Sequence, residues 1–152
     1  MQIFRAEKTT PTEIFRQLSE LDKQCVGADG WSAESFISEA ARESGIVLYA
    51  AENSRIAGLI CGCFGADQAD ITSVAVAPEC RRQGIADNLI CEFISLLPCI
   101  TESIFLEVRE SNSAAIALYK KNGFEQISIR KRFYSSPVEN AIIMKKDLNK
   151  EG

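Results

Sequence analysis

A basic segment with one glycine, between residues 73 and 86, has the residue types needed to bind an anion. An apolar run ends at Pro78, and a short loop with Arg81 and Arg82 leads into a helix that we expect to begin at Gly84. The first backbone N–H groups of a helix have no intrahelical partner and lie at the positive end of its dipole. Here these amides belong to Gln83, Gly84, Ile85 and Ala86. The segment therefore predicts a phosphate site that small side chains leave open.

The common phosphate motifs do not explain this segment. A P-loop requires G-x-x-x-x-G-K-[ST] and a dinucleotide fold requires G-x-G-x-x-G, and the sequence contains neither. The simpler alternative is a plain strand-to-helix turn with one glycine, which an isolated R-x-x-G-x-A pattern favours.

A second group of polar residues follows about twenty positions later. Glu107 lies inside an apolar strand pattern, Asn112 suits a helix N-cap, and Tyr119 lies near the end of the helix that follows. Taken singly, each has a structural explanation. Glu107 would face outward or pair with Arg109, and Tyr119 would belong to the core or its rim.

The 152-residue chain has no histidine and six cysteines, and this excludes several kinds of catalysis. No Ser-His-Asp triad, Cys-His dyad or His-bearing zinc site can form. A general acid or base must then be a carboxylate, Tyr, Lys or Cys, or act through water. The cysteines form no C-x-x-C pair and fall mostly in apolar runs. We therefore predict no metal and mostly buried thiols, with Cys80, beside Arg81 and Arg82, as an oxidation-prone exception.

Hydrophobic periodicity and turn signals predict the elements that must position these residues. Thr10 would cap the first helix and Glu13 would complete its capping box. Gly123 would end the last helix. Strands are predicted over residues 1–7, 45–51, 55–64, 69–76, 103–108, 124–134 and 141–146, and helices over 10–25, 32–43, 84–97 and 113–122. The fold class is α/β, with a mixed, mostly antiparallel sheet of about seven strands and about four helices on both faces. With no linker in the sequence, we expect one domain over residues 1–152.

Together the two segments resemble the GNAT N-acetyltransferase superfamily. V-A-V-x-P-x-x-R-R-x-G-I-A is similar to its acetyl-CoA-binding core, with the signature [QR]-x-x-G-x-[GA]; Ala86 stands where glycine is commoner. L-E-V-R-x-S-N-x-x-A-I-x-L-Y-x-x-x-G-F is similar to the second half of the family, especially to bacterial enzymes that acetylate the N-terminal alanine of a small-subunit ribosomal protein. Trp31-Ser32 and residues 129–134 and 139–144 extend this resemblance over nearly the whole chain.

The resemblance implies the GNAT acyl-CoA N-acyltransferase fold and a role for each polar residue. The 82–87 loop would hold the pyrophosphate of acetyl-CoA, and the 74–76 strand would hydrogen-bond its pantetheine arm. Glu107 would be the general base and Tyr119 the general acid. The predicted acetyl-CoA-binding residues are Val74, Ala75, Val76, Arg81, Arg82, Gln83, Gly84, Ile85, Ala86, Asp87 and Asn112.

The proton chemistry of acetyl transfer is compatible with a chain without histidine. An α-amine has a pKa of about 7.7–8.0, against about 10.4 for lysine, so a carboxylate acting directly or through water is sufficient for an N-terminus. A phenol with a pKa of about 10 can protonate a thiolate with a pKa of about 8.5. Backbone amides near Val76 would polarise the thioester carbonyl. These groups favour direct attack in a ternary complex over an acyl-cysteine route.

We therefore expect acetyl transfer from acetyl-CoA to a primary amine, foremost the N-terminal α-amine of a protein such as a basic ribosomal protein. Two alternatives stay open: a GNAT enzyme for small-molecule amines, and a noncatalytic acyl-CoA-binding module. The net charge of −4 is compatible with a basic substrate and argues against broad nucleic-acid contact. Free thiols and the lack of a signal or membrane-spanning run predict a cytoplasmic protein without membrane contact. We expect a monomer or weak dimer.

Overall fold

The computed structural model of the chain describes residues 1–135 and 137–148. Over these residues the chain forms seven β-strands and four α-helices, and it divides into two compact units. The first unit comprises residues 1–63 and 71–97, and the second comprises residues 64–70 and the chain from residue 98 onward. The predicted acetyl-CoA turn belongs to the first unit, and Glu107 and Tyr119 belong to the second.

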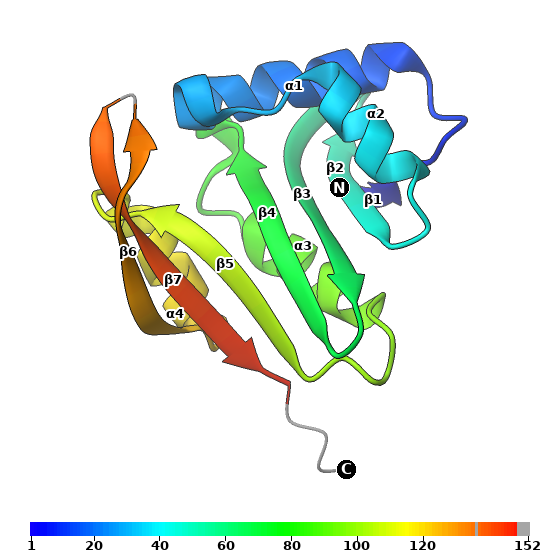
Figure 1. Cartoon of the computed structure of the whole chain (residues 1–152). Helices are drawn as coiled ribbons and strands as arrows, with labels where there is room; N and C mark the ends of the chain where they lie inside the picture. Colours follow the sequence, from blue (N-terminus) through cyan, green and yellow to red (C-terminus); the bar gives the residue numbers. More distant parts are fainter. Residues whose placement is uncertain (136, 149–152) are drawn as a thin grey trace. The chain divides into compact units, whose positions relative to one another are not determined.

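The first unit contains the strands up to β4 and three of the α-helices (Figure 1). Its elements are β1 (Gln2–Arg5), α1 (Thr12–Val26), α2 (Ala33–Ala41), β2 (Gly45–Glu52), β3 (Arg55–Gly65), β4 (Gln68–Val76) and α3 (Ile85–Ser95), with short 3₁₀ turns at Gly27–Asp29 and Pro78–Cys80. The strand order is β1-β2-β3-β4, and the β1–β2 and β2–β3 pairs are antiparallel. The tip of the β3–β4 hairpin, residues 64–70, belongs to the second unit.

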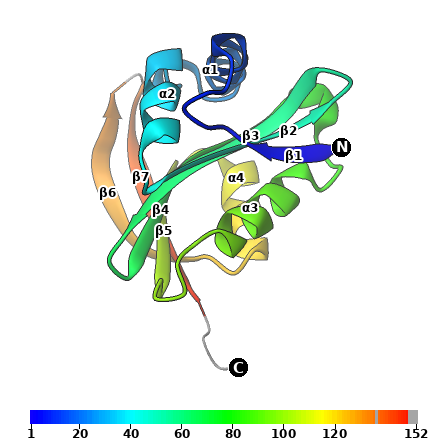
Figure 2. The same cartoon turned by 90° about the vertical axis from the view of Figure 1, so that its right-hand side faces the viewer.

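Helices cover both faces of the strands in the first unit. Figure 2 shows α1 and α2 on one face of β1–β3 and α3 on the other. Strands β2 and β3 are therefore nearly continuous apolar runs, as strands buried on both faces must be. Phe15, Leu18 and Phe36 pack from α1 and α2 against Val47 and Leu59. From α3, the buried residues are Ile85, Leu89, Ile90 and Phe93.

The second unit is built on β5 (Ser103–Arg109), β6 (Glu125–Ser135) and β7 (Val138–Asp147), with α4 (Ser113–Lys121) between β5 and β6 in the sequence. The strand order is β5-β7-β6, and both pairs are antiparallel. Helix α4 lies behind these strands in the view of Figure 1. Alternate β5 residues (Ile104, Leu106 and Val108) are buried, so Glu107 lies on the opposite face.

The predicted α/β class and the mostly antiparallel strand pairing are confirmed, and most element boundaries lie within about two residues of those predicted. Ser32 caps α2 by accepting a bond from the Ser35 amide, and Gly123, at φ +90°, ends α4 as expected. The helix-start prediction for Thr10 was wrong. Its hydroxyl accepts a bond from the Glu7 amide (2.8 Å), and Pro11 takes the N-cap position without a side-chain cap.

The prediction of mostly buried cysteines was also wrong. Only Cys61 is buried among the six; Cys25, Cys63 and Cys80 are half-buried, and Cys91 and Cys99 are exposed. Cys91 follows the buried pair Leu89 and Ile90 on α3, and the helical turn carries it away from the core. Burial raises the pKa of Cys61 to about 12.

The prediction of one domain over residues 1–152 stays a prediction, and residues 149–152 lie outside the described part. Within the described residues, no helix is both long and apolar enough to cross a membrane. Nor do these residues contain a group of three His, Cys, Asp or Glu side chains placed to hold a metal ion.

Candidate active site

The turn from β4 into α3 places the predicted acetyl-CoA residues in one continuous segment of the first unit. A 3₁₀ turn at Pro78–Cys80 follows β4, and Gly84 is the N-cap of α3 with left-handed angles (φ 76°, ψ 13°). Among the described residues no side chain caps this helix end, and the first amides of a helix have no partner within the helix. The geometry therefore supplies the donors that an anion requires.

The backbone at this turn is open to a ligand. Among the described residues, nothing lies within 4 Å of the position that a Cβ would take at Gly84. Arg82 also has a positive φ (65°), which costs a non-glycine residue about 1–2 kcal/mol. Arg81, Arg82 and Gln83 are exposed. A pyrophosphate can thus approach the amides with two cationic side chains beside it.

Arg81 also has a structural role that the sequence pattern did not show. Its Nε donates to the carbonyl oxygen of Val76 (3.2 Å), and its Nη2 lies 3.8 Å from the Cys25 sulfur. The Cys25 thiol donates to the same Val76 oxygen (3.5 Å). Arg81 therefore ties the loop to the end of β4 and to the last turn of α1.

Close packing fixes where α3 begins. A Cβ at Gly58 in β3 would lie 3.0 Å from the Ile85 Cγ2 atom and 3.2 Å from the carbonyl oxygen of Ala75. The absence of a side chain at Gly58 therefore lets the first turn of α3 rest directly on the strands. Along β4, Ala75 is buried while Val74 and Val76 are half-buried.

A buried carboxylate braces β4 from the side of α1. Asp22 accepts a hydrogen bond from the Ser73 hydroxyl and another from the Trp31 amide (2.8 Å). Its side chain is fully buried, and burial raises its pKa. Sequence reasoning missed this residue, although Asp22 falls four positions after Leu18 on the apolar face of α1. A charged residue on the apolar face of a helix was the signal that could have identified Asp22 as a buried carboxylate.

In the second unit, Glu107 projects from the exposed face of β5. Its side chain retains 34% of its exposure, and its Oε1 lies 3.4 Å from Nη1 of Arg130 in β6. The expected alternative, pairing with Arg109, was wrong, whereas the outward orientation is confirmed. Arg109 instead pairs with Glu139 of β7 at 3.0 Å.

The Arg109–Glu139 pair fastens the β6–β7 hairpin to the end of β5. Glu139 also accepts a bond from the Ser111 amide (2.6 Å), and Arg109 also donates to the Pro137 carbonyl (3.0 Å). The Arg109 guanidinium lies 4.3 Å from the centre of the Tyr134 ring. The hydrogen bonds from Ser111 and Arg109 lower the pKa of Glu139.

Asn112 and Tyr119 lie at the two ends of α4. The Asn112 side chain accepts a bond from the Ala115 amide (3.2 Å), which confirms the predicted N-cap. Tyr119 is only 7% exposed and contacts the Phe124 ring edge-on, with ring centres 5.8 Å apart. The phenol is therefore held rigidly in the last turn of the helix, as the structural explanation expected. Whether it also donates a proton stays a prediction, as does the contact of Asn112 with CoA.

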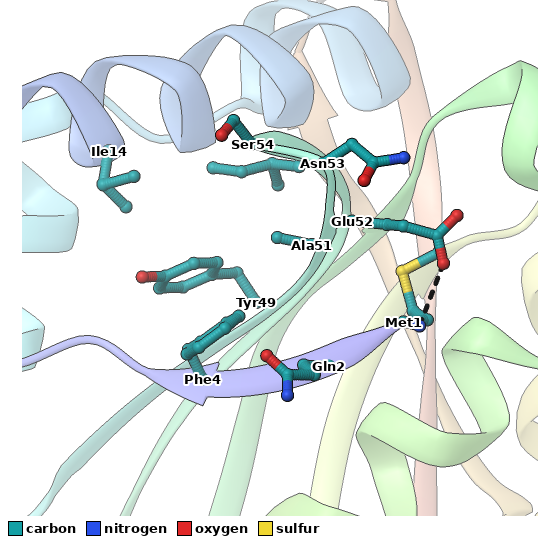
Figure 3. Close-up of a pocket in the computed structure, with 10 residues that line it drawn as sticks. Met1, Gln2, Phe4, Ile14, Tyr49, Ala51, Glu52, Asn53 and Ser54 are labelled. Atoms are coloured by element: carbon teal, nitrogen blue, oxygen red, sulfur yellow. Dashed lines mark hydrogen bonds and ion pairs between the residues drawn. The ribbon is translucent and has the colours of Figure 1, made fainter.

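A separate cavity of about 430 Å³ lies in the first unit, where β1 and the β2–β3 turn meet α1. Figure 3 shows the Tyr49 and Phe4 rings stacked beside it, with Ile14 above, and the Met1 ammonium bonded to Glu52 (3.0 Å). It shares no residue with the 74–87 segment. No predicted site residue lines it.

Comparison with known proteins agrees with this arrangement. Residues 12–124 match the family described as "Acetyltransferase (GNAT) family". The chain is 33% identical over 141 residues to the [ribosomal protein bS18]-alanine N-acetyltransferase of Haemophilus ducreyi, covering 90% of this chain and 96% of that one.

Two solved structures show the same fold. The crystal structure of the ribosomal-protein-S18-alanine N-acetyltransferase from Escherichia coli has a TM-score of 0.80 and 27% identity, with 99% of this chain and 97% of that chain covered. A GNAT family acetyltransferase from Elizabethkingia anophelis with acetyl-CoA bound has a TM-score of 0.75 at 21% identity, covering 97% of each chain.

Proposed function

Because this chain belongs to the acetyltransferase (GNAT) family, we propose that it transfers the acetyl group of acetyl-CoA to the N-terminal α-amine of a protein. Family membership confirms the expected enzyme class, an acetyltransferase. The acceptor rests on one observation: the Haemophilus ducreyi relative that matches over 90% of this chain is named for an alanine of ribosomal protein bS18. That N-terminal alanine is the first candidate acceptor here.

The turn before α3 supports acetyl-CoA as the donor. Its open amides at Gly84 and the neighbouring Arg81 and Arg82 suit a pyrophosphate, which takes several N–H donors and positive charge. The Val74–Val76 stretch of β4 would offer backbone groups to the pantetheine amides; at Val76 this is the N–H, because the carbonyl already accepts from Arg81 and Cys25. The solved relative with bound acetyl-CoA shares this fold.

Glu107 and Tyr119 supply the two proton transfers. Glu107 takes a proton from the incoming ammonium, directly or through water, as the amine nitrogen attacks the thioester carbon. The C–S bond then breaks, Tyr119 gives its proton to the departing thiolate, and the second proton of the attacking nitrogen passes to solvent, which returns a proton to the Tyr119 phenolate. An α-amine needs little help from the base because about a tenth of it is already neutral at pH 7.

A peptide panel with acetyl-CoA tests the acceptor class. One peptide begins with alanine followed by arginines; a second has a blocked N-terminus and an internal lysine; the third arm contains free amino acids and polyamines. Mass spectrometry should find acetylation of the first peptide at its N-terminus. Preferential acetylation of free amines would replace the proposal with a small-molecule enzyme. Binding of CoA without turnover in any arm would point to a noncatalytic module.

A further inference from the structure

Two arginine–carboxylate pairs occupy one face of the second unit's strands. Glu107 stands opposite Ile143 of β7, while Arg109 and Arg130 both stand opposite Ala141. Since β7 lies between β5 and β6, the two arginines approach the small Ala141 side chain from either side. Either cation is therefore placed within reach of the carboxylates on this face.

The Arg109–Glu139 pair is closed. Its side chains retain only 18% and 15% of their exposure, and the two groups lie 3.0 Å apart. Each also bonds a backbone group, Pro137 for the arginine and Ser111 for the glutamate. Exchange of Arg109 for another cation would leave several polar groups without partners, which is unfavourable for buried groups.

The Arg130–Glu107 pair is more exposed to solvent than the Arg109–Glu139 pair. The groups lie 3.4 Å apart, and their side chains retain 57% and 34% of their exposure. The Arg130 guanidinium lies 5.1 Å from the centre of the Phe133 ring. A further cation on this face, Lys145, pairs with Asp147 at 3.2 Å. Exposed ion pairs contribute little free energy, so water and other cations can replace Arg130.

We propose that Arg130 is an exchangeable counterion of Glu107, a positioning residue that orients the carboxylate until the ammonium group of the acceptor displaces it. This inference rests on the proposed function, in which Glu107 receives an ammonium. The exchange replaces one cation beside the carboxylate by another and forms no covalent bond. Arg130 remains on the exposed strand β6, where its long side chain can swing into solvent.

The exchange has a kinetic signature that a purely structural role lacks. Loss of Arg130 removes the competitor of the acceptor ammonium, so the acceptor KM falls. The same loss frees the Glu107 side chain to adopt other rotamers, so kcat falls as well. Arg130→Lys keeps the charge without the planar guanidinium group, so its acceptor KM and its kcat should lie between those of the wild type and those of Arg130→Gln.

Steady-state kinetics with the alanine-initiated peptide test this signature. We expect Arg130→Gln to lower the acceptor KM about twofold to fivefold, the range set by an exposed ion pair, and to lower kcat, with partial recovery of both in Arg130→Lys. Lys131→Gln removes the same charge from the next residue of β6 and should match the wild type. The proposal would be overturned if Arg130→Gln left kcat and the acceptor KM unchanged, or raised KM with kcat unchanged. Equal effects of Arg130→Gln and Lys131→Gln would also overturn it.

A second measurement separates this inference from the proposed function. If the wild-type protein acetylates no N-terminal peptide, the proposed function fails, and the contact is then tested by NMR of ¹⁵N-labelled arginine side chains. The Arg130 Nε–H signal should shift in Glu107→Gln, and the Arg109 signal, which belongs to the closed pair, should move less. An unmoved Arg130 signal would refute the counterion role.

Discussion

Glu107 and Tyr119 have opposite environments, and each suits its proposed task. The carboxylate lies on an open strand face where a charged amine can reach it. The phenol is packed in the last turn of α4 against Phe124, so its position varies little. A base that must meet an incoming substrate benefits from access, whereas an acid that serves a leaving group benefits from fixed geometry.

We predict that Glu107→Gln and Tyr119→Phe each lower turnover about 100-fold or more, in line with general acid–base catalysis. Glutamine keeps the shape of Glu107 without a proton acceptor of comparable basicity, and phenylalanine keeps the ring contact of Tyr119 with Phe124. Affinity for acetyl-CoA should change little in either variant. Peptide acetylation rates and calorimetric titration with CoA provide the two measurements. Wild-type turnover in both variants would remove the assigned roles.

The roles of Glu107 and Tyr119 came from the resemblance to the GNAT family and could not be derived from the residue patterns alone. A glutamate in an apolar strand predicted an outward side chain, and β5 confirmed it. The pattern could not predict that Arg130 rather than Arg109 would be its partner, because that choice depends on the register across β7. Strand register is set by long-range pairing, to which local sequence gives no direct access.

Among the elements, α3 shows how local signals fix a helix start. The change from an apolar strand to a basic loop and Gly84 predicted this boundary to within one residue. The 3₁₀ turn at Pro78–Cys80 escaped prediction, as did the bonds from Arg81 and Cys25 to the Val76 carbonyl. The Cys25 bond joins segments 51 residues apart, so no local pattern reveals it, and the Arg81 bond depends on how the 3₁₀ turn folds the loop back onto the end of β4.

Substitution of Gly84 by alanine tests the turn against a control at a second positive-φ glycine, Gly27→Ala. Gly84 lies in the left-handed helical region (φ 76°, ψ 13°) and Gly27 outside it (φ 66°, ψ −130°). An added Cβ would meet none of the described residues within 4 Å at either position. Alanine at Gly84 should therefore cost about 1–2 kcal/mol of unfolding free energy, and alanine at Gly27 at least as much, because its angles are readily adopted only by glycine; denaturant titration measures both. Only Gly84→Ala should also weaken CoA binding, because only Gly84 presents its amide at the start of α3. Gly84→Glu should abolish binding.

Normal CoA affinity in Gly84→Glu would place the phosphate site elsewhere. Equal loss of affinity in Gly84→Ala and Gly27→Ala would attribute the effect to lowered stability rather than to the turn. The control is informative because Gly27 ends α1 and lies outside the predicted acetyl-CoA segment.

For the stability of the whole molecule, Asp22 is a buried charge that joins three segments of the first unit. Its carboxylate binds Ser73 of β4 and the Trp31 amide before α2, while Asp22 itself belongs to α1. Ser19 adds a bond from its hydroxyl to the Trp31 carbonyl (2.7 Å). This cluster therefore links the stability of the first unit to the strand that precedes the proposed acetyl-CoA turn.

Burial raises the pKa of Asp22 in the folded protein, while the bonds from Ser73 and Trp31 partly oppose this shift. A carboxyl group with a raised folded pKa binds its proton more tightly in the folded state than in the unfolded chain. The stability that Asp22 gains from this tighter proton binding is thus fully present below the unfolded pKa of about 3.9. It is lost as the pH rises through the folded pKa of Asp22.

We therefore expect the unfolding free energy of the wild type, relative to that of Asp22→Asn, to decline from about pH 4 upward and to level off once Asp22 is ionised in the folded state. Asparagine is nearly the same size, can accept the Trp31 bond and does not titrate, so subtracting its curve removes the contribution of the other carboxylates. Urea unfolding of both proteins at several pH values measures the difference. A difference that is constant, or that grows in favour of the wild type with rising pH, would show that burial does not dominate at Asp22.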